Sequence, residues 1–262
     1  MCFRGNHEVA GNFTHYKMRF AAIAENAGSS SLSGTAMFYS FDDGLAHFVM
    51  WDSEAYWAQP VDSQTAMENW LRADLAAANA NREAVPWVIA LAHKSWEMDA
   101  TLQCPLGAGC VIWQILVEGG VDLHFMGHIH YYSRNLAQYP NAANGTGAVD
   151  HNCSSANLGN ATNPVATYTD CAYMTTIITA APGDQEVNRR RALAHAPVDA
   201  PSIGVTSTNN YGYGFMTIES ATTLRWRFET AVPHVNSTAP HYTDDLTLIV
   251  NHHGPRTNLP PA

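Results

Sequence analysis

Two histidines separated by one residue stand near the middle of the chain, directly after an apolar stretch. Residues 121–126 are apolar enough for a buried strand, and Gly127 then leads into His128, Ile129 and His130. Because successive side chains of a strand point to opposite faces, His128 and His130 are predicted to share one face. Neutral imidazole is the commonest metal ligand among side chains, so the pair is a candidate metal site. The alternative is a polar turn whose histidines are only hydrogen-bonded.

A second strand is predicted to bring another histidine to the same edge of a sheet. Residues 87–92 form a continuous apolar run that ends at His93. In open α/β sheets, functional sites gather at the carboxyl ends of the strands, where both His93 and His128 fall. His124, inside the other strand, is interpreted as structural. Near the start of the chain, Gly5-Asn6-His7-Glu8 offers a ligand, an acid or base and an orienting group, or else a solvated turn.

The elements that must position these residues alternate between strand and helix in the first half of the chain. Residues 35–41 and 45–51 predict a hairpin around Asp42-Asp43-Gly44. Residues 63–80 have apolar side chains at helical spacing, with Asp62 or Ser63 as the N-cap. A short helix over 111–118 ends at Gly119-Gly120, which gives an α/β alternation.

The second half is less regular. Residues 135–172 read as a loop, 173–181 as a strand, and 182–210 as irregular, with Arg189-Arg190-Arg191 interpreted as a solvated charge run. Residues 214–219 and 224–229 predict a last hairpin, and 245–250 a final edge strand. We find neither an internal repeat nor a linker, so residues 1–262 are predicted to form a single domain.

Composition narrows the classes of partner. The chain has 262 residues, is 46% hydrophobic and carries a formal net charge of -10, which disfavours nucleic acid as a partner. A small anionic substrate would need local positive charge, and a bound metal cation can supply it. No stretch approaches 18 consecutive apolar residues, so no transmembrane segment is predicted. Whether the chain forms an oligomer or a larger assembly stays open.

Cysteines and glycosylation motifs favour an oxidising, secretory compartment. The five cysteines lack zinc-finger spacing, and Asn-X-Ser/Thr sequons begin at Asn12, Asn144, Asn152, Asn160 and Asn236. Two short loops are predicted to be closed by disulfides, Cys104 with Cys110 and Cys153 with Cys171, which leaves Cys2 without a partner. No signal peptide follows Met1, so we expect either a missing N-terminal part or a different compartment.

In this order, Gly5-Asn6-His7-Glu8, the strand to His93 and Gly127-His128-Ile129-His130 resemble the second half of the calcineurin-type metallophosphoesterase signature. Residues 39–44, 45–54, 180–184 and 210–214 further resemble animal-type purple acid phosphatases, so the resemblance covers essentially the whole chain. It implies an α/β fold, a β-sandwich flanked by helices in four layers. It also implies a ferric ion and a divalent ion (Zn, Mn or Fe) that together hydrolyse a small phosphate monoester.

Residue roles follow from the same resemblance. Asn6, His93 and His128 would bind the divalent metal, His130 would bind the ferric ion, and His7 would contact phosphate and assist the leaving group. The resemblance also implies a secreted, cell-surface or lysosomal or vacuolar protein.

The family's first motifs, Asp-X-Gly or Asp-X-His and then Gly-Asp-X-X-Tyr, do not precede Gly5 here. Three of the seven expected metal ligands are therefore missing from this sequence, and we expect an N-terminally incomplete chain that is inactive alone. Two alternatives remain open. One is a non-catalytic binding or structural protein of the same fold, and the other is a phosphodiesterase-type metallohydrolase.

Overall fold

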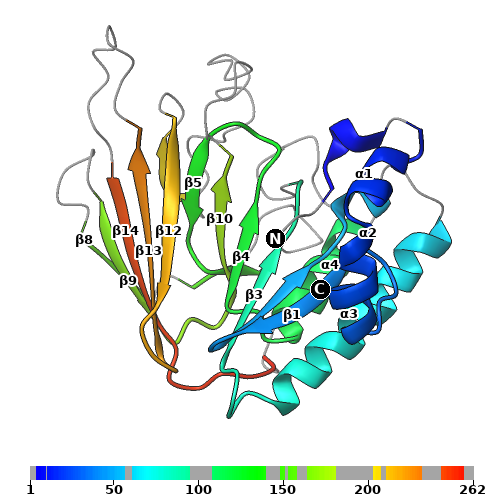
Figure 1. Cartoon of the computed structure of the whole chain (residues 1–262). Coiled ribbons are helices and arrows are strands. Elements are labelled where there is room, and N and C mark those ends of the chain that lie inside the picture. Colours follow the sequence, from blue (N-terminus) through cyan, green and yellow to red (C-terminus); the bar gives the residue numbers. More distant parts are fainter. Residues whose placement is uncertain are drawn as a thin grey trace, which may run out of the picture.

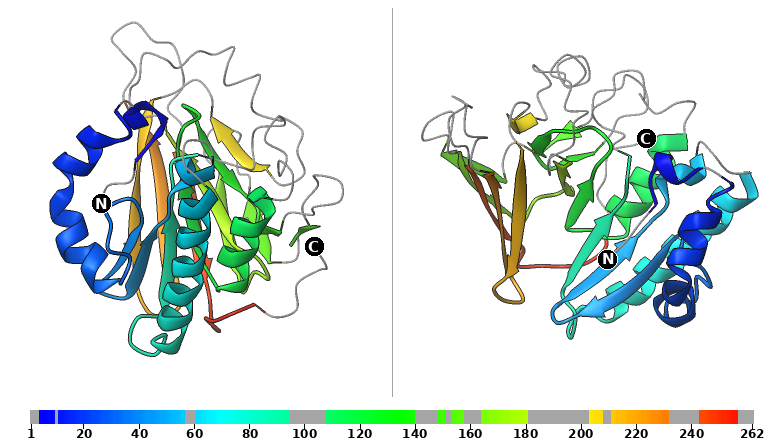
Figure 2. Two further views of the ribbon diagram at one scale, coloured as in Figure 1. Left: turned by 90° about the vertical axis from the view of Figure 1, so that its right-hand side faces the viewer. Right: turned by 45° about the horizontal axis from the view of Figure 1, so that its top comes forward.

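The computed structural model describes residues 4–9, 11–56, 61–94, 108–139, 148–150, 153–157, 164–180, 203–207, 211–231 and 243–256. They form two β-sheets that lie face to face, with helices on the outer face of the larger sheet (Figure 1). The left view of Figure 2 looks onto the helices with the sheets behind them, and the right view shows the same three layers side by side. The predicted α/β sandwich is therefore confirmed, although no described helix covers the outer face of the smaller sheet.

The larger sheet has seven strands, in the spatial order β1 (Tyr39–Asp43), β2 (Ala46–Met50), β3 (Trp87–Leu91), β4 (Leu123–Met126), β10 (Thr175–Thr179), β5 (Tyr132–Asn135) and β11 (Ile203–Ser207). The central strands β2, β3, β4 and β10 run parallel to one another. Strands β1, β5 and β11 each pair antiparallel with their neighbours. The carboxyl ends of β2, β3 and β4 consequently lie side by side at one edge of the sheet.

The smaller sheet has five strands, in the order β12 (Gly212–Ile218), β13 (Thr223–Thr230), β14 (Thr243–Ile249), β9 (Val165–Thr169) and β8 (Ser154–Asn157). A separate two-stranded pair joins β6 (Gln138–Tyr139) to β7 (Ala148–Val149). Strand β13 alternates buried and exposed side chains, with Trp226 and Phe228 facing inward. This period of two places one face of the sheet in the core and leaves the other face exposed.

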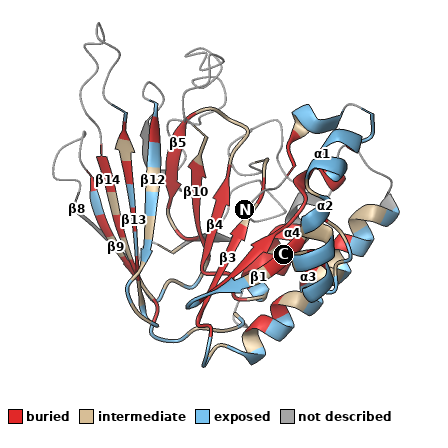
Figure 3. Cartoon of the chain, in the orientation of Figure 1, coloured by how far each residue is buried: buried red, intermediate tan, exposed pale blue. Residues whose placement is uncertain are grey.

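The core between the sheets is built from inward-facing residues of both, among them Phe48, Phe125, Trp226 and Phe228. Figure 3 shows the central strands of the larger sheet as mostly buried, whereas β1 ends in exposed residues. Helices cover the second face of β2 and β3. Parallel strands buried on both faces are typically continuous apolar runs, and Trp87–Leu91 is such a run.

Two long helices pack on the outer face of the larger sheet, α3 (Val61–Ala80) and α4 (Ala108–Glu118). Helix α3 buries Met67, Leu71 and Leu75 against the sheet, at the spacing of one helical face. Shorter helical elements precede and follow the first hairpin: η1 (Asn6–Val9), α1 (Thr14–Arg19), α2 (Ala21–Ile23), η2 (Ala24–Gly28) and η3 (Ser53–Tyr56). None of the helices within the described ranges is both long and apolar enough to cross a bilayer.

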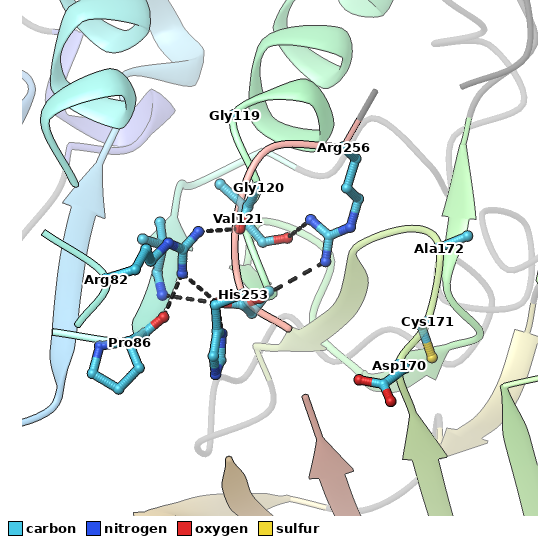
Figure 4. A network of polar contacts seen from close by, with 12 residues as sticks. Arg82, Pro86, Gly119, Gly120, Val121, Asp170, Cys171, Ala172, His253 and Arg256 are labelled. Carbon is cyan, nitrogen blue, oxygen red and sulfur yellow. Dashed lines mark hydrogen bonds and ion pairs between the residues drawn. The ribbon is translucent and has the colours of Figure 1, made fainter. Parts of the chain in front are cut away.

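A polar network ties the last described segment to the amino edge of the larger sheet (Figure 4). Arg82 donates to the carbonyl oxygens of Pro86 and Gly120, and Arg256 donates to that of Val121. The two arginines also flank the buried carboxylate of Asp122. The segment that follows β14, the last strand described in the smaller sheet, is thus fixed against the amino ends of strands in the larger sheet.

Most elements expected in the first half of the chain are confirmed. The hairpin forms as β1 and β2, the apolar run as β3, and the helix before the central strand as α4, which starts three residues earlier than predicted. The predicted N-cap was wrong, because α3 begins at Val61 and places Asp62 and Ser63 within its first turn. An acidic residue there still interacts favourably with the helix dipole.

The irregular reading of the second half was wrong in three places. The predicted loop 135–172 contains β8 and β9, and the irregular region 182–210 contains β11. The predicted edge strand is internal, because β14 pairs with β13 on one side and with β9 on the other. The strand over 173–181 and the last hairpin are confirmed as β10 and as β12 with β13. Residues 189–191 lie outside the described ranges.

Candidate metal centre

Three side chains meet where β3 and β4 end. The amide oxygen of Asn6 lies 2.8 Å from Nε2 of His93, and Nδ1 of His128 lies 3.2 Å from the same nitrogen. The two imidazole rings stand edge to face, with centroids 5.0 Å apart. One amide oxygen and one ring nitrogen, drawn from two distant parts of the chain, therefore both lie within hydrogen-bond distance of Nε2 of His93.

The first of these parts is held close to His93 by a glycine. A methyl group at Gly5 would lie only 3.0 Å from Cε1 and Nε2 of the His93 ring, so the ring packs directly on the glycine backbone. The turn is closed by Glu8, whose carboxylate accepts from the Gly5 amide at 2.7 Å. A side chain at Gly5 would push the imidazole away from Asn6.

The third part bends sharply after β4. The amide of Gly127 donates to the carbonyl of His93 at 2.9 Å, and that of Ile129 donates to the carbonyl of Gly127 at 2.8 Å. His128 has a φ of 69°, a left-handed conformation that non-glycine residues rarely adopt. The prediction that strand alternation orients His128 and His130 was wrong, because β4 ends at Met126 and a turn follows.

The His93 ring is neutral over a wide pH range. Burial lowers its pKa to about 3, and the neighbouring His128 and Lys94 act in the same direction. His7 and His130 contribute smaller effects of the same sign. His7 is exposed, whereas His130 is half-buried. A neutral imidazole keeps a lone pair available for a metal ion.

Within the part of the chain that the structure describes, no three His, Cys, Asp or Glu side chains come close enough to hold a metal ion. The cluster is instead two imidazoles completed by an amide. Donors of this kind, nitrogen with one oxygen, are typical of zinc and other divalent transition metals.

His124 is structural, as the sequence analysis interpreted it. Its ring is fully buried beside Trp113, and Nε2 accepts from the indole of Trp51 at 3.1 Å. Burial lowers its pKa to about 3, so the ring stays neutral in the core.

The sequence analysis missed four charged residues beside the cluster. Arg4 and Asp52 form a buried ion pair directly before Gly5, and Lys94 pairs with Glu54 directly after His93. The sequence shows that Arg4 precedes Gly5 and that Lys94 follows His93, but it gives no signal that predicts their acidic partners.

Of the predicted modifications, the structure contains the Cys153–Cys171 disulfide, with Cα atoms 5.0 Å apart. Asn12 is exposed, next to the short helix α1. The other four sequons, Cys2, Cys104 and the side chain of Cys110 lie outside what the structure describes.

Comparison with known proteins places this cluster in a family. Residues 1–132 match the model of the calcineurin-like phosphoesterase family, and this stretch contains Asn6, His7, His93, His128 and His130. The match spans half of the chain, so the chain belongs to that family.

The relatives are acid phosphatases. The chain is 35% identical to purple acid phosphatase 15 of Arabidopsis thaliana over 147 residues, which are 53% of this chain and 26% of the relative. It is 31% identical to human acid phosphatase type 7 over 144 residues, 50% of this chain and 31% of the relative. The matched stretches thus span about a quarter to a third of the curated relatives.

A solved structure shares the fold. Purple acid phosphatase PPD1 from yellow lupin (Lupinus luteus) seeds superposes with a TM-score of 0.53 and 16% identity, over 82% of this chain and 33% of that chain. At this identity the likeness concerns the fold alone. It agrees with the sandwich of two sheets described above.

Proposed function

We propose that this chain contributes to an acid phosphatase that hydrolyses phosphate monoesters at a dinuclear metal centre. The observation that carries the proposal is the convergence of Asn6, His93 and His128 within the stretch that matches the phosphoesterase family. The names of the relatives supply the class of substrate.

The donor atoms fit a divalent ion. Two ligand atoms at about 2.0–2.1 Å from a tetrahedral zinc ion lie about 3.3 Å apart. The separation between His93 Nε2 and His128 Nδ1 is 3.2 Å, which is close to that spacing. His93 is also neutral, as a ligand must be. Asn6, His93 and His128 are therefore our candidates for holding the divalent ion, Zn, Mn or Fe.

The remaining two histidines take the roles that the family pattern implies. His130 would bind the ferric ion, and His7, which is exposed and follows Asn6 directly, would hydrogen-bond the phosphate and assist the leaving group. When bound, two cations orient a phosphate, neutralise its charge and lower the pKa of a coordinated water. The small phosphate ester is the substrate that we assign to this edge of the sheet.

We further propose that these 262 residues alone hold one divalent ion and do not turn over substrate at an enzymatic rate. Of the family motifs found in this sequence, only His130 would serve the ferric position, and within the described residues no three His, Cys, Asp or Glu side chains gather as a metal site. Two-metal hydrolysis needs the cations about 3.5–4 Å apart, and a shared carboxylate is what fixes such a spacing.

The test begins with cobalt(II), whose visible absorption reports its ligands. We expect one cobalt ion per chain, lost in His128→Ala and retained in His15→Ala, an exposed histidine on α1 that serves as the matched control. Absence of cobalt binding by the unaltered chain would refute the metal centre.

Activity is then measured as release of a chromogenic phenol from its phosphate ester at mildly acidic pH. The 262-residue chain is compared with the longest reading frame that contains it. If the 262 residues bind two metals and turn over like the longer protein, the ligand assignment is wrong.

The compartment is a further part of this proposal. The Cys153–Cys171 disulfide and the exposed sequon at Asn12 support a secreted, cell-surface or lysosomal-type location. Mass mapping of non-reduced peptides should find that disulfide and the Cys104–Cys110 pair, and a glycan at Asn12. Free thiols at all four cysteines would contradict an oxidising compartment.

A further inference from the structure

We propose that four charged residues, the buried Arg4, Asp52 and Glu54 and the partly exposed Lys94, hold Asn6 and His93 in position at the metal centre. We call these four residues the charge cluster. The proposal rests on the metal centre proposed above and adds residues that make no contact with the metal themselves.

The first half of the charge cluster fixes the chain just before Asn6. The guanidinium of Arg4 makes a two-pronged contact with Asp52, with Nε donating to Oδ1 at 2.7 Å and Nη2 donating to Oδ2. Its planar group also lies over the ring of Phe13, 3.9 Å from the centroid. Arg4 is 2% exposed and Asp52 is 3% exposed. A planar, doubly bonded arginine fixes both position and orientation, so the Arg4 backbone that leads into Gly5 is held firmly.

The second half fixes the chain just after His93. The backbone amide of Lys94 donates to the hydroxyl of Ser53 at 3.0 Å. The Lys94 ammonium reaches the carboxylate of Glu54 at 3.1 Å, and Glu54 is 2% exposed. Backbone and side chain of Lys94 are therefore held by neighbouring residues of one short helix.

Both halves share a single anchor. Asp52 follows β2, and Ser53 and Glu54 begin η3, so all three belong to one turn at the carboxyl edge of the sheet. The Asp52 carboxylate also accepts from the Glu54 amide at 3.0 Å. One turn thus sets the position of the Asn6 segment relative to the His93 segment, and the distance of 2.8 Å between these two side chains depends on it.

Stability alone does not explain these charges. Replacing a buried ion pair by packed apolar residues is often neutral or stabilising, so buried pairs are weak evidence of a gain in stability. Within the described ranges, Arg4 Nη1 and Glu54 Oε1 are buried without a hydrogen-bond partner. Because the charge cluster contains these two unpaired buried atoms, the alignment of Asn6 with His93 explains it better than a gain in stability does. Residues that orient metal ligands in this way typically change metal affinity about 10–100-fold when altered.

The chain contains a matched control pair. Arg134 and Asp244 form a second buried two-pronged ion pair, with contacts of 2.7 and 2.8 Å, and it joins β5 to β14 between the two sheets. Both side chains are at most 1% exposed. Its chemistry is that of the Arg4–Asp52 pair, but among the residues that the structure describes its ion-pair and hydrogen-bond partners do not include Asn6 or His93.

The experiment compares Asp52→Asn with Asp244→Asn in the 262-residue chain, measuring thermal midpoint, cobalt(II) affinity and cobalt absorption. Both variants should lower the thermal midpoint. Only Asp52→Asn should weaken cobalt binding, by about 10–100-fold, and change the shape of the visible absorption bands. Arg4→Lys keeps the charge without the two-pronged geometry and should fall between the unaltered chain and Asp52→Asn.

The outcomes separate this proposal from the one on which it rests. If the unaltered chain binds no cobalt, the metal centre is refuted. If it binds cobalt and Asp52→Asn and Asp244→Asn retain equal affinity, the positioning role is refuted. Should Asp52→Asn fail to fold, the double variant Glu54→Gln with Lys94→Met removes the other pair of charges together. Unchanged cobalt affinity and absorption in that variant would overturn the proposal.

Discussion

The two edges of the seven-stranded sheet differ in how their polar groups are satisfied. At the amino edge, the buried carboxylate of Asp122 accepts from Arg82 at 2.9 Å and from the Val88 amide at 3.0 Å, with His253 at 3.3 Å. Burial alone would raise the pKa of Asp122. The hydrogen bond from His253 and the charges of Arg82 and Arg256 outweigh it, so the pKa is lowered.

The carboxyl edge shows the opposite arrangement. There, Asn6, His93 and His128 bring a side-chain amide oxygen and two ring nitrogens into contact, and His128 has a left-handed backbone. The carboxylates of Asp52 and Glu54 at this edge pair with Arg4 and Lys94 instead. An amide oxygen and ring nitrogens that meet in this way can direct their lone pairs at a cation more favourably than at each other. The comparison teaches that the polar groups of the amino edge stabilise the sheet, whereas the left-handed backbone at the carboxyl edge is what we expect where local stability is given up for the proposed metal centre.

The largest effect should come from breaking the amino edge. Asp122→Asn leaves the Arg82 and Arg256 charges without their buried partner, and we expect a loss of about 3–5 kcal/mol of unfolding free energy. Urea unfolding measures the loss. Cobalt(II) affinity, measured where the variant is still folded, should stay unchanged because the site lies at the other edge. A large fall in affinity would show that the two edges are not independent.

The strands β3 and β4 and the histidines that follow them could be predicted from the sequence, because the patterns that mark them are local. Continuous apolar runs marked β3 and β4, and the histidines that follow them fall at one edge. Strand β9 was missed because it is only five residues long in a region rich in Asn, Gly and Ser, and its partner β14 lies far along the chain. The pairing of Arg4 with Asp52, 48 residues apart, also left no local signal. The left-handed turn at His128 depends on the hydrogen bonds around it, so strand alternation could not predict it.

A smaller difference in unfolding free energy should come from residues with a left-handed backbone, one at each edge of the sheet. His128→Gly removes a proposed ligand but also relieves a left-handed conformation, so its unfolding free energy should stay within about 1 kcal/mol of the unaltered chain. Gly120, at the amino edge, has a φ of 74°, and an added methyl group would lie 2.4 Å from the Gly254 carbonyl oxygen. Gly120→Ala should therefore lose about 1–3 kcal/mol.

Cobalt binding should respond in the reverse order, lost in His128→Gly and kept in Gly120→Ala. Urea unfolding and cobalt titration of both variants provide the measurement. If His128→Gly is the more destabilised of the two, the turn at His128 is not a strained feature of the site.

The smallest expected effect on stability comes from a histidine at the amino edge that lies between two carboxylates. His47, near the start of β2, lies between Asp42 on β1 at 2.6 Å and Asp74 on α3 at 3.0 Å, and Ser40 donates to the same Asp74 carboxylate. Burial alone would lower the pKa of His47. The hydrogen bonds and charges of Asp74 and Asp42 outweigh it, so the pKa is raised above the ordinary value of 6.5.

A histidine whose pKa is raised on folding stabilises the folded state fully below the pKa of the unfolded chain. The stabilisation is then lost as pH rises through the pKa of the folded chain. Urea unfolding of the unaltered chain and of His47→Gln, which keeps hydrogen-bonding groups without the charge, should differ most near pH 5. The difference should shrink towards pH 8, while cobalt binding at a fixed pH stays the same in both. Parallel stability curves from pH 5 to 8 would mean that the two carboxylates do not hold a charged imidazole, and the amino edge would then owe its stability to the arginines alone.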